Sequence, residues 1–314
     1  MSFLTDKTYK NKVTEKKSPM SKAEIPESSF HMLDRQLTSG GFCEWPSAPY
    51  RTDSTAWAIL SIREDALGDA VERARSCLAK SQLKDGRVCI SDDHPQAFWP
   101  TPFSALAWHG SPLHRNNQEQ AIQFMLQAAG SIFEKNPNQL FAHDPSLRGW
   151  PWIENTFSWV VPTASAILAL KLCGYSRHTR VQEAVRLIHD RQLPDGGWNY
   201  GNTIVYDQVL LPQPDTTGMA LAALSGLVEK GAIEKSLFYL KNEVEHCRTP
   251  LSLGWAIIGL SAWQDKPPQS DTWIIESLNL QQTYGVYGTT LLSLLKCAYL
   301  SGGDFVEFVA SRKA

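Results

Sequence analysis

Asp215 is predicted to lie at the start of a helix, where a carboxyl group can cap the helix or act as an acid. It follows Pro214 and precedes Thr216, at the head of a long apolar segment. To donate a proton near neutral pH, its carboxyl needs a raised pKa, which a dry site with hydrogen-bonded neighbours provides. The alternative is a helix N-cap, a role that the similar context of Asp53 favours, and one residue can fill both. We take Asp215 and Thr216 as the candidate catalytic residues and Asp53 as a further candidate acid or base.

Aromatic residues form the second candidate group, because the chain has 11 tryptophans and several fall in long loops. Their faces can stabilise a carbocation by about 0.5–2 kcal/mol each, or line a pocket for an isoprenoid or a sugar. The alternative is structural, since an indole such as that of Trp198 can pack on a turn and join neighbouring helices. The candidate substrate-binding residues are Trp99, Trp150, Trp152, Phe157, Trp159, Trp198, Tyr200 and Tyr206.

Other ionisable residues lie in the same loops. His143 is followed by Asp144, Glu154 lies among tryptophans, and Asp207 is flanked by Tyr206 and a glutamine. His143, Glu154 and Asp207 are therefore candidate acids or bases. None has the spacing of a metal-ligand motif, so solvated loop residues are the alternative and no metal or cofactor is expected.

Two kinds of segment alternate along the chain and must position these residues. One is amphipathic and ends in a glycine turn, as at 34–42, 80–87, 190–198 and, more weakly, 280–287. The other begins with a polar or proline residue and is apolar nearly all round, which indicates burial on every side. The first kind predicts outer helices near 24–37, 67–82, 115–134, 178–192, 233–245 and 270–282. The second predicts inner helices near 53–64, 101–109, 162–173, 215–229, 251–264 and 287–301.

Six inner helices surrounded by six outer ones predict an all-α fold, an (α/α)6 toroid. We expect a polar leader at 1–23, one toroid domain at 24–302 and a C-terminal tail at 303–314. The segments that lead into inner helices are long, at 84–100, 135–161 and 195–214, which predicts a functional mouth at that end.

Composition limits the function classes. Apolar residues make up 43% of the chain, enough for a large core, and the net charge of -2 argues against nucleic acid as a partner. No apolar run is long enough to span a bilayer, and the lysine-containing leader lacks the apolar stretch of a signal peptide. The six cysteines form no CxxC pair, which predicts free thiols in the cytoplasm.

The segment from Gln192 to Trp198 resembles the QW repeats of squalene-hopene and oxidosqualene cyclases, and such repeats cover most of 30–300. The stretch 149–217 also resembles bacterial prenyltransferase/squalene oxidase repeat proteins. The resemblance implies the toroid and an isoprenoid or other apolar small molecule as ligand. Protein prenyltransferases share the fold and use an Asp-x-Cys zinc motif, but no cysteine follows Asp207 or Asp215, so no zinc site is implied.

The resemblance to class II terpene cyclases implies that Asp215 protonates an alkene or an epoxide. Those cyclases carry an Asp-x-Asp-Asp motif, of which 213–216 keeps only the central aspartate, and 215–218 is more similar to the Asp-Cys-Thr-Ala of oxidosqualene cyclases. Full cyclases have two toroids, so a single one implies a shorter prenyl chain, a second copy, a partner subunit or contact with a membrane surface. Two alternatives stay open: a non-catalytic toroid that binds a lipid or a protein, and a glycan lyase or hydrolase.

Overall fold

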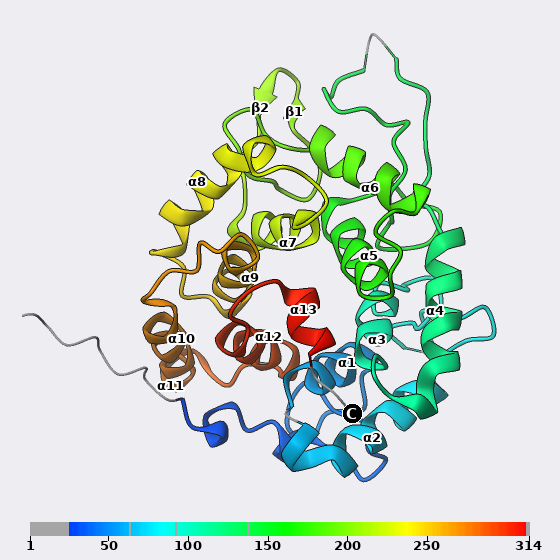
Figure 1. The fold of residues 1–314 in the computed structure, drawn as a ribbon, viewed down its shortest axis with the longest axis vertical. Coiled ribbons are helices and arrows are strands. Elements are labelled where there is room, and N and C mark those ends of the chain that lie inside the picture. The colour runs from blue at the N-terminus through cyan, green and yellow to red at the C-terminus, as the bar shows by residue number, and fades with distance from the viewer. Residues whose placement is uncertain (1–24, 63, 92, 137–138, 312–314) are drawn as a thin grey trace, which may run out of the picture.

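Helices arranged in two concentric rings make up most of the computed structural model, which describes residues 25–62, 64–91, 93–136 and 139–311 (Figure 1). Each inner helix contacts the next, and the last contacts the first, which closes the ring. The predicted all-α (α/α)6 toroid is confirmed. The inner helices are α1 (Thr52–Ser61), α3 (Thr101–Ala107), α5 (Val160–Leu172), α7 (Pro214–Leu224), α9 (Pro250–Ser261) and α12 (Thr289–Leu300). The outer helices are α2 (Glu64–Lys80), α4 (Arg115–Gln127), α6 (Thr179–Asp190), α8 (Glu234–Val244) and α10 (Ser270–Asn279).

The outer position next to α12 differs from the prediction. In place of an α-helix near 24–37, the chain forms two short 3-10 helices, η1 (Glu27–Phe30) and η2 (Leu33–Arg35). His31 lies between them with a left-handed φ of 46°, which interrupts a right-handed helix. The segment still packs on the inner ring, since the Ile25 backbone N–H donates to the Tyr299 hydroxyl of α12 at 3.3 Å.

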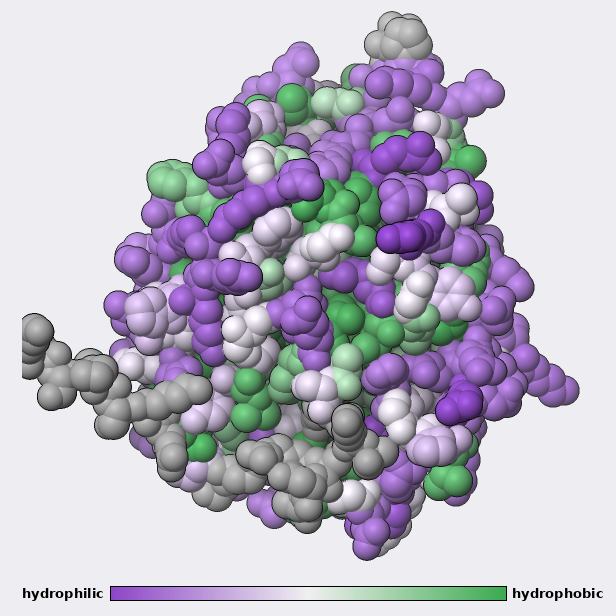
Figure 2. All heavy atoms as spheres, in the orientation of Figure 1, coloured by the Kyte–Doolittle hydropathy of each residue, from purple (hydrophilic) through white to green (hydrophobic). Residues whose placement is uncertain are grey.

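The remaining elements are short. They comprise η3 (Pro112–His114), η4 (Lys230–Ile233), α11 (Gln281–Tyr284) and an antiparallel hairpin of β1 (Ile204–Val205) and β2 (Gln208–Val209). Polar residues cover the perimeter formed by the outer helices, and apolar residues gather near the centre of the face seen in Figure 2. No helix among the described residues has both the length and the apolar character needed to cross a bilayer.

The glycine turn at the end of an outer segment packs against the next outer helix around the ring. The first turn glycine has a φ of 94° or 95° in three turns, a conformation that L side chains rarely adopt. A Cβ atom there would lie 2.2–2.7 Å from backbone atoms of the following outer helix, so only glycine allows the contact. These glycines are Gly40, Gly86 and Gly196. The glutamine before each turn donates to that same outer helix, from Gln36, Gln82 and Gln192.

A buried threonine near the start of an inner helix holds the residue that follows each of these three turns, and a fourth threonine holds Trp150 in the same way. Its hydroxyl accepts the backbone N–H of that residue at 2.9–3.0 Å. The pairs are Phe42 with Thr55, Val88 with Thr101, Trp150 with Thr163, and Trp198 with Thr217. The repeat therefore fixes each loop onto the N-terminal end of an inner helix.

The segment predicted as a tail contains a helix, α13 (Phe305–Ala310), which lies over the centre of the ring (Figure 1). Phe305 is fully buried, with its ring centroid 6.3 Å from that of Trp57 and 6.1 Å from that of Trp255. The Lys171 ammonium of α5 lies 3.6 Å from the Asp304 carboxylate and donates to the Ser225 carbonyl oxygen. This helix closes the C-terminal end of the inner ring.

Candidate functional site

A cavity of about 330 Å³, here called the chamber, lies at the N-terminal ends of the inner helices. All six inner helices line it, and most do so with their second or third residue and their sixth. Residues four apart share one face of a helix, so these positions form an upper and a lower layer around the toroid axis. The upper layer is Phe103, Val161, Pro162, Asp215, Leu251, Thr290 and Leu291. The lower layer is Trp57, Ser165, Met219, Trp255 and Leu294.

Aromatic rings dominate both ends of the chamber. At its base, the Trp57 centroid lies 5.7 Å from that of Trp255, and Phe305 packs behind both rings. Phe103 of the upper layer packs on the same Trp57 ring, with centroids 4.7 Å apart. At its mouth, the loop residues Trp99 and Trp152 form an edge-to-face pair at 6.1 Å. Three of the predicted aromatic residues, Trp99, Trp152 and Tyr200, therefore lie in one wall, which is suited to an apolar ligand.

Asp215 is the one carboxylate among the described residues that line the chamber. It is the second residue of α7, behind Pro214, and the N-cap position belongs to Gln213, which makes no capping bond with its side chain. Burial is the largest influence on the Asp215 carboxyl and raises its pKa, and the backbone N–H groups of Asp215 and Thr216 lower that pKa by less. No ion pair of Asp215 occurs in the described part of the chain, so desolvation is the strongest influence on its pKa.

Asp53 occupies the same position of α1 but has a different environment. Its carboxylate accepts two hydrogen bonds from the Arg51 guanidinium, at 2.7 and 2.9 Å, and it is 4% exposed. It does not line the chamber. The ion pair with Arg51 therefore holds this side chain at the start of α1, away from the chamber.

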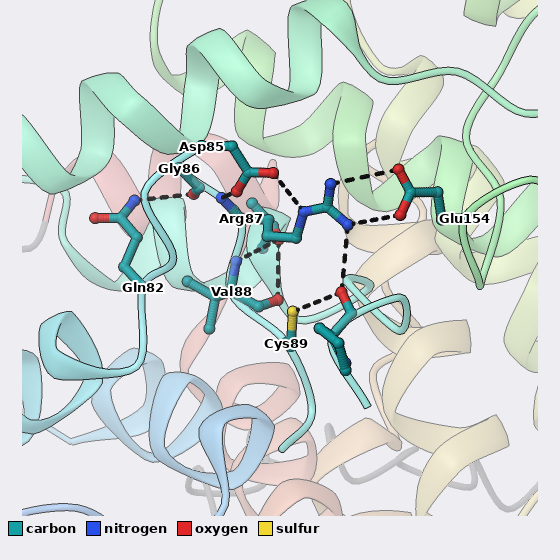
Figure 3. Close-up of polar contacts among 9 residues, drawn as sticks. Gln82, Asp85, Gly86, Arg87, Val88, Cys89 and Glu154 are labelled. Atoms are coloured by element: carbon teal, nitrogen blue, oxygen red, sulfur yellow. Dashed lines mark hydrogen bonds and ion pairs between the residues drawn. The ribbon is translucent and has the colours of Figure 1, made fainter. Parts of the chain in front are cut away.

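Glu154 also has a structural partner. Its carboxylate accepts hydrogen bonds from Arg87 Nη1 at 2.9 Å and Nη2 at 3.4 Å, and Arg87 is itself held by Asp85 at 2.7 Å (Figure 3). This ion pair joins the loop that carries Trp152 to the loop that carries Trp99. Glu154 therefore helps to position the aromatic pair at the mouth of the chamber.

A second cavity of about 230 Å³, here called the side cavity, contains three more predicted residues, His143, Phe157 and Trp159. The side cavity adjoins the chamber, because the same two backbone segments line both. Trp159 and Gly201 line the side cavity, and Val161 and Tyr200 line the chamber. The Val160 N–H donates to the Tyr200 carbonyl oxygen at 3.0 Å, so one pair of backbone segments separates the two cavities.

The structure places other predicted residues outside both cavities. Trp150 and Trp198 are buried, and their indole N–H groups donate to the carbonyl oxygens of Met125 at 3.0 Å and Ile188 at 2.7 Å. Thr216 is buried in α7 behind Asp215. Tyr206 and Asp207 are exposed at the tip of the β1–β2 hairpin, with left-handed φ values of 50° and 62°.

Sequence reasoning missed much of the chamber and also Arg191, a buried residue that lines the side cavity. The chamber residues it left out include Phe103, Met219 and Trp255. The signal that identifies the last two is their position four residues after Asp215 and Leu251, on the same helix faces. Among the described residues, no group of three or more His, Cys, Asp or Glu side chains is arranged to hold a metal ion.

Comparisons with known proteins establish the fold. No family model and no curated protein matches the sequence. A variant of the type II terpene cyclase MstE from Scytonema is similar in structure, with a TM-score of 0.58 and 11% identity over 86% of this chain and 96% of that one. The GH76A alpha-1,6-mannanase from Salegentibacter, in complex with alpha-1,6-mannotriose, has a TM-score of 0.59 and 11% identity over 91% and 98%. An alpha-amylase from Clostridium perfringens has a TM-score of 0.58 and 9% identity over 88% and 99%.

These neighbours share the toroid and differ in chemistry. MstE is also known in complex with the substrate geranylgeranyl dihydroxybenzoate, whereas the mannanase and the amylase act on glycans. At such low identities the likeness shows the fold alone. The function has to be argued from the chamber.

Proposed function

We propose that the chamber binds a short prenyl chain and that Asp215 starts its cyclisation by protonation. The observation that carries the proposal is the position of one partly buried carboxyl group in a wall that is otherwise largely aromatic and aliphatic. Desolvation favours the neutral, proton-bearing form of that carboxyl group. A neutral acid facing an apolar ligand is the arrangement that protonation of an alkene or an epoxide requires.

The reaction would begin when the Asp215 O–H bond breaks and its proton adds to the alkene carbon or the epoxide oxygen. The resulting carbocation is attacked by a neighbouring double bond of the same chain, which forms the ring. The faces of Trp57, Phe103 and Trp255 stabilise the cation, by about 0.5–2 kcal/mol for each ring. Loss of a proton from a neighbouring carbon ends the reaction, and the Asp215 carboxylate regains its proton from water.

The size of the chamber favours a short substrate. Small-molecule pockets hold about 300–1,000 Å³, and the chamber is near the lower limit at about 330 Å³. The base is closed by Phe305 and α13, so a long chain cannot extend through the ring. A substrate well below the length of squalene follows from these limits.

The glycan-acting alternative has less support. Glycoside hydrolysis normally uses two carboxyl groups on either side of the scissile bond. In the chamber, Asp215 has no carboxylate partner among the described lining residues, and the tryptophan-rich base offers few groups to bind sugar hydroxyls. A non-catalytic toroid that only binds an apolar molecule would use the same wall, so the experiment must separate binding from turnover.

The test is incubation of the whole chain in D2O with linear prenyl alcohols of about ten to twenty carbons and with their terminal epoxides. Cyclic products are detected by gas chromatography and mass spectrometry. Cyclisation started by Asp215 would place one carbon-bound deuterium in each product made from an alkene. We expect Asp215→Asn to abolish turnover while it retains binding of the probe, measured by quenching of tryptophan fluorescence. The matched control is Asp195→Asn, in an exposed turn, which should keep full turnover.

Two results would contradict the proposal. If Asp215→Asn folds and turns over as the wild type does, this carboxyl is not the acid. If the wild type binds a probe but forms no product from any of them, the toroid is a binding protein for apolar molecules.

A further inference from the structure

Buried nitrogen atoms without hydrogen-bond partners gather in the wall of the side cavity. Among the described residues they include Nε and Nη1 of Arg191 and Nδ1 of His143, and both residues line this cavity. Arg191 is 4% exposed. Buried polar groups in folded proteins are nearly always hydrogen-bonded, so several such atoms at one cavity indicate that its usual contents are a ligand with acceptor atoms.

The two side chains are held rigidly. Arg191 is the C-cap of α6, and its Nη2 donates to the Asp144 carbonyl oxygen at 3.2 Å. The His143 ring stacks on Phe141, with centroids 4.3 Å apart and an angle of 18° between the planes. Burial lowers the pKa of Arg191 to about 10, so the guanidinium is still a cation at neutral pH. A rigid cation with unused N–H groups is organised to bind before the ligand arrives.

Further donors lie in the same wall. The Ser158 hydroxyl oxygen accepts the Gly149 N–H at 3.0 Å, which leaves its own O–H available to donate. The Ser131 hydroxyl and the Asn202 amide also line the cavity. The rest of the wall is largely aromatic or aliphatic and includes Phe157 and Trp159. Such a wall excludes water, which strengthens hydrogen bonds between a charged donor and its acceptor.

Two acidic residues lie near Arg191, and one of them, Asp190, forms an ion pair with its Nη1 atom. The Asp190 carboxylate lies 3.4 Å from Arg191 Nη1 and accepts the Asp144 backbone N–H at 2.9 Å. The Asp144 carboxylate accepts the N–H and the hydroxyl of Ser146 at 2.9 and 2.6 Å. Neither carboxylate satisfies Nε of Arg191, so this donor is available to a ligand.

We propose that the side cavity is a binding site for a small oxyanion, held by Arg191 and His143. A carboxylate and a phosphate both present the paired oxygen acceptors that the planar guanidinium binds best. The site is independent of the reaction proposed for Asp215 and remains if that reaction is wrong. It also gives His143 the role of a donor to an anion, in place of the acid, base or metal ligand considered from the sequence.

The test is titration calorimetry on the whole chain with inorganic phosphate, with acetate, and with acetamide as the uncharged analogue of acetate. We expect saturable binding of phosphate, acetate or both, and none of acetamide. Arg191→Gln should weaken that binding at least tenfold. The matched control is Arg186→Gln, on an exposed position of the same helix, which should bind as the wild type does.

Two further variants keep the test informative if Arg191→Gln does not fold. His143→Phe keeps the stack on Phe141 but removes the nitrogen, and should weaken binding. Ser131→Leu should fill the cavity and abolish binding without a change at Arg191. Binding of phosphate alone would identify a phosphoryl ligand, and binding of acetate alone a carboxylate.

The proposal is overturned if neither anion binds the wild type, or if the Ser131→Leu and His143→Phe variants bind as well as the wild type. Asp215→Asn should bind the oxyanion normally. That variant separates the two proposals, because it removes the proposed acid and leaves the side cavity intact.

Discussion

Replacing Phe305 with alanine should remove the support beneath the chamber and destabilise the whole toroid. The ring is fully buried between α13 and the tryptophans of α1 and α9. A buried phenylalanine truncated to alanine typically costs about 3–5 kcal/mol, because apolar contacts are lost and the cavity left behind collapses only in part. We expect Phe305→Ala to lower the free energy of unfolding by that amount.

Urea denaturation followed by tryptophan fluorescence measures this loss, since Trp57 and Trp255 lie next to the substituted ring. For a chain of this size, the loss corresponds to a fall in Tm of about 5–8 °C. Phe238→Ala is the matched control, because Phe238 is 69% exposed on α8, and it should change stability by less than about 0.5 kcal/mol. A loss below about 1 kcal/mol for Phe305→Ala, with an unchanged dependence on urea, would refute the assignment of α13 as the base of the core.

Two other predictions concern a turn and an acid. Gly196→Ala should destabilise the chain more than Gly174→Ala. Both glycines have positive φ values, which cost an L residue about 1–2 kcal/mol. Only at Gly196 would the new Cβ also meet a backbone atom, 2.5 Å away in Lys235. Equal losses of unfolding free energy would mean that the turn can move away from α8. The pKa of Asp215 is raised in the folded state, so ionisation of this carboxyl group costs stability. The wild type should therefore gain stability relative to Asp215→Asn as the pH falls from the raised pKa towards the unfolded value of about 3.9. The difference in Tm between the two proteins, measured against pH, tests this direction. A wild-type Tm that falls relative to that of Asp215→Asn on acidification contradicts it.

The fold could be predicted because the inner and outer helices have different surfaces. Segments such as 162–173 are apolar all round, and the structure buries nearly every residue of α5, whereas α6 buries one face. The glycine turns predicted where the outer helices end. The prediction of one helix over 24–37 was wrong, because His31 takes a left-handed conformation that divides the segment into two 3-10 helices and that the local pattern does not indicate.

The site could be predicted only in part. Asp215 was identifiable from its place at the head of an inner helix, and aromatic loop residues from their abundance. To predict the lower layer of the chamber, the first residue of each inner helix must be known to within one position. The sequence locates helix ends only to within a few residues. Arg191 looks like one more polar residue of a repeat, and its burial follows from the long 139–159 loop that covers it, which no local pattern encodes.

The contacts of Phe305 with Trp57 of α1 and Trp255 of α9 join residues that are far apart in the sequence. During synthesis, the ring of inner helices stays open until α12, which contacts α1, has left the ribosome. Until then, α1 exposes on its inner side the tryptophan that later forms the chamber base. A nascent chain of this kind presents an apolar surface while the intervening helices are made, which makes it a natural client for chaperones, and a chain that stops before α12 would leave the ring open.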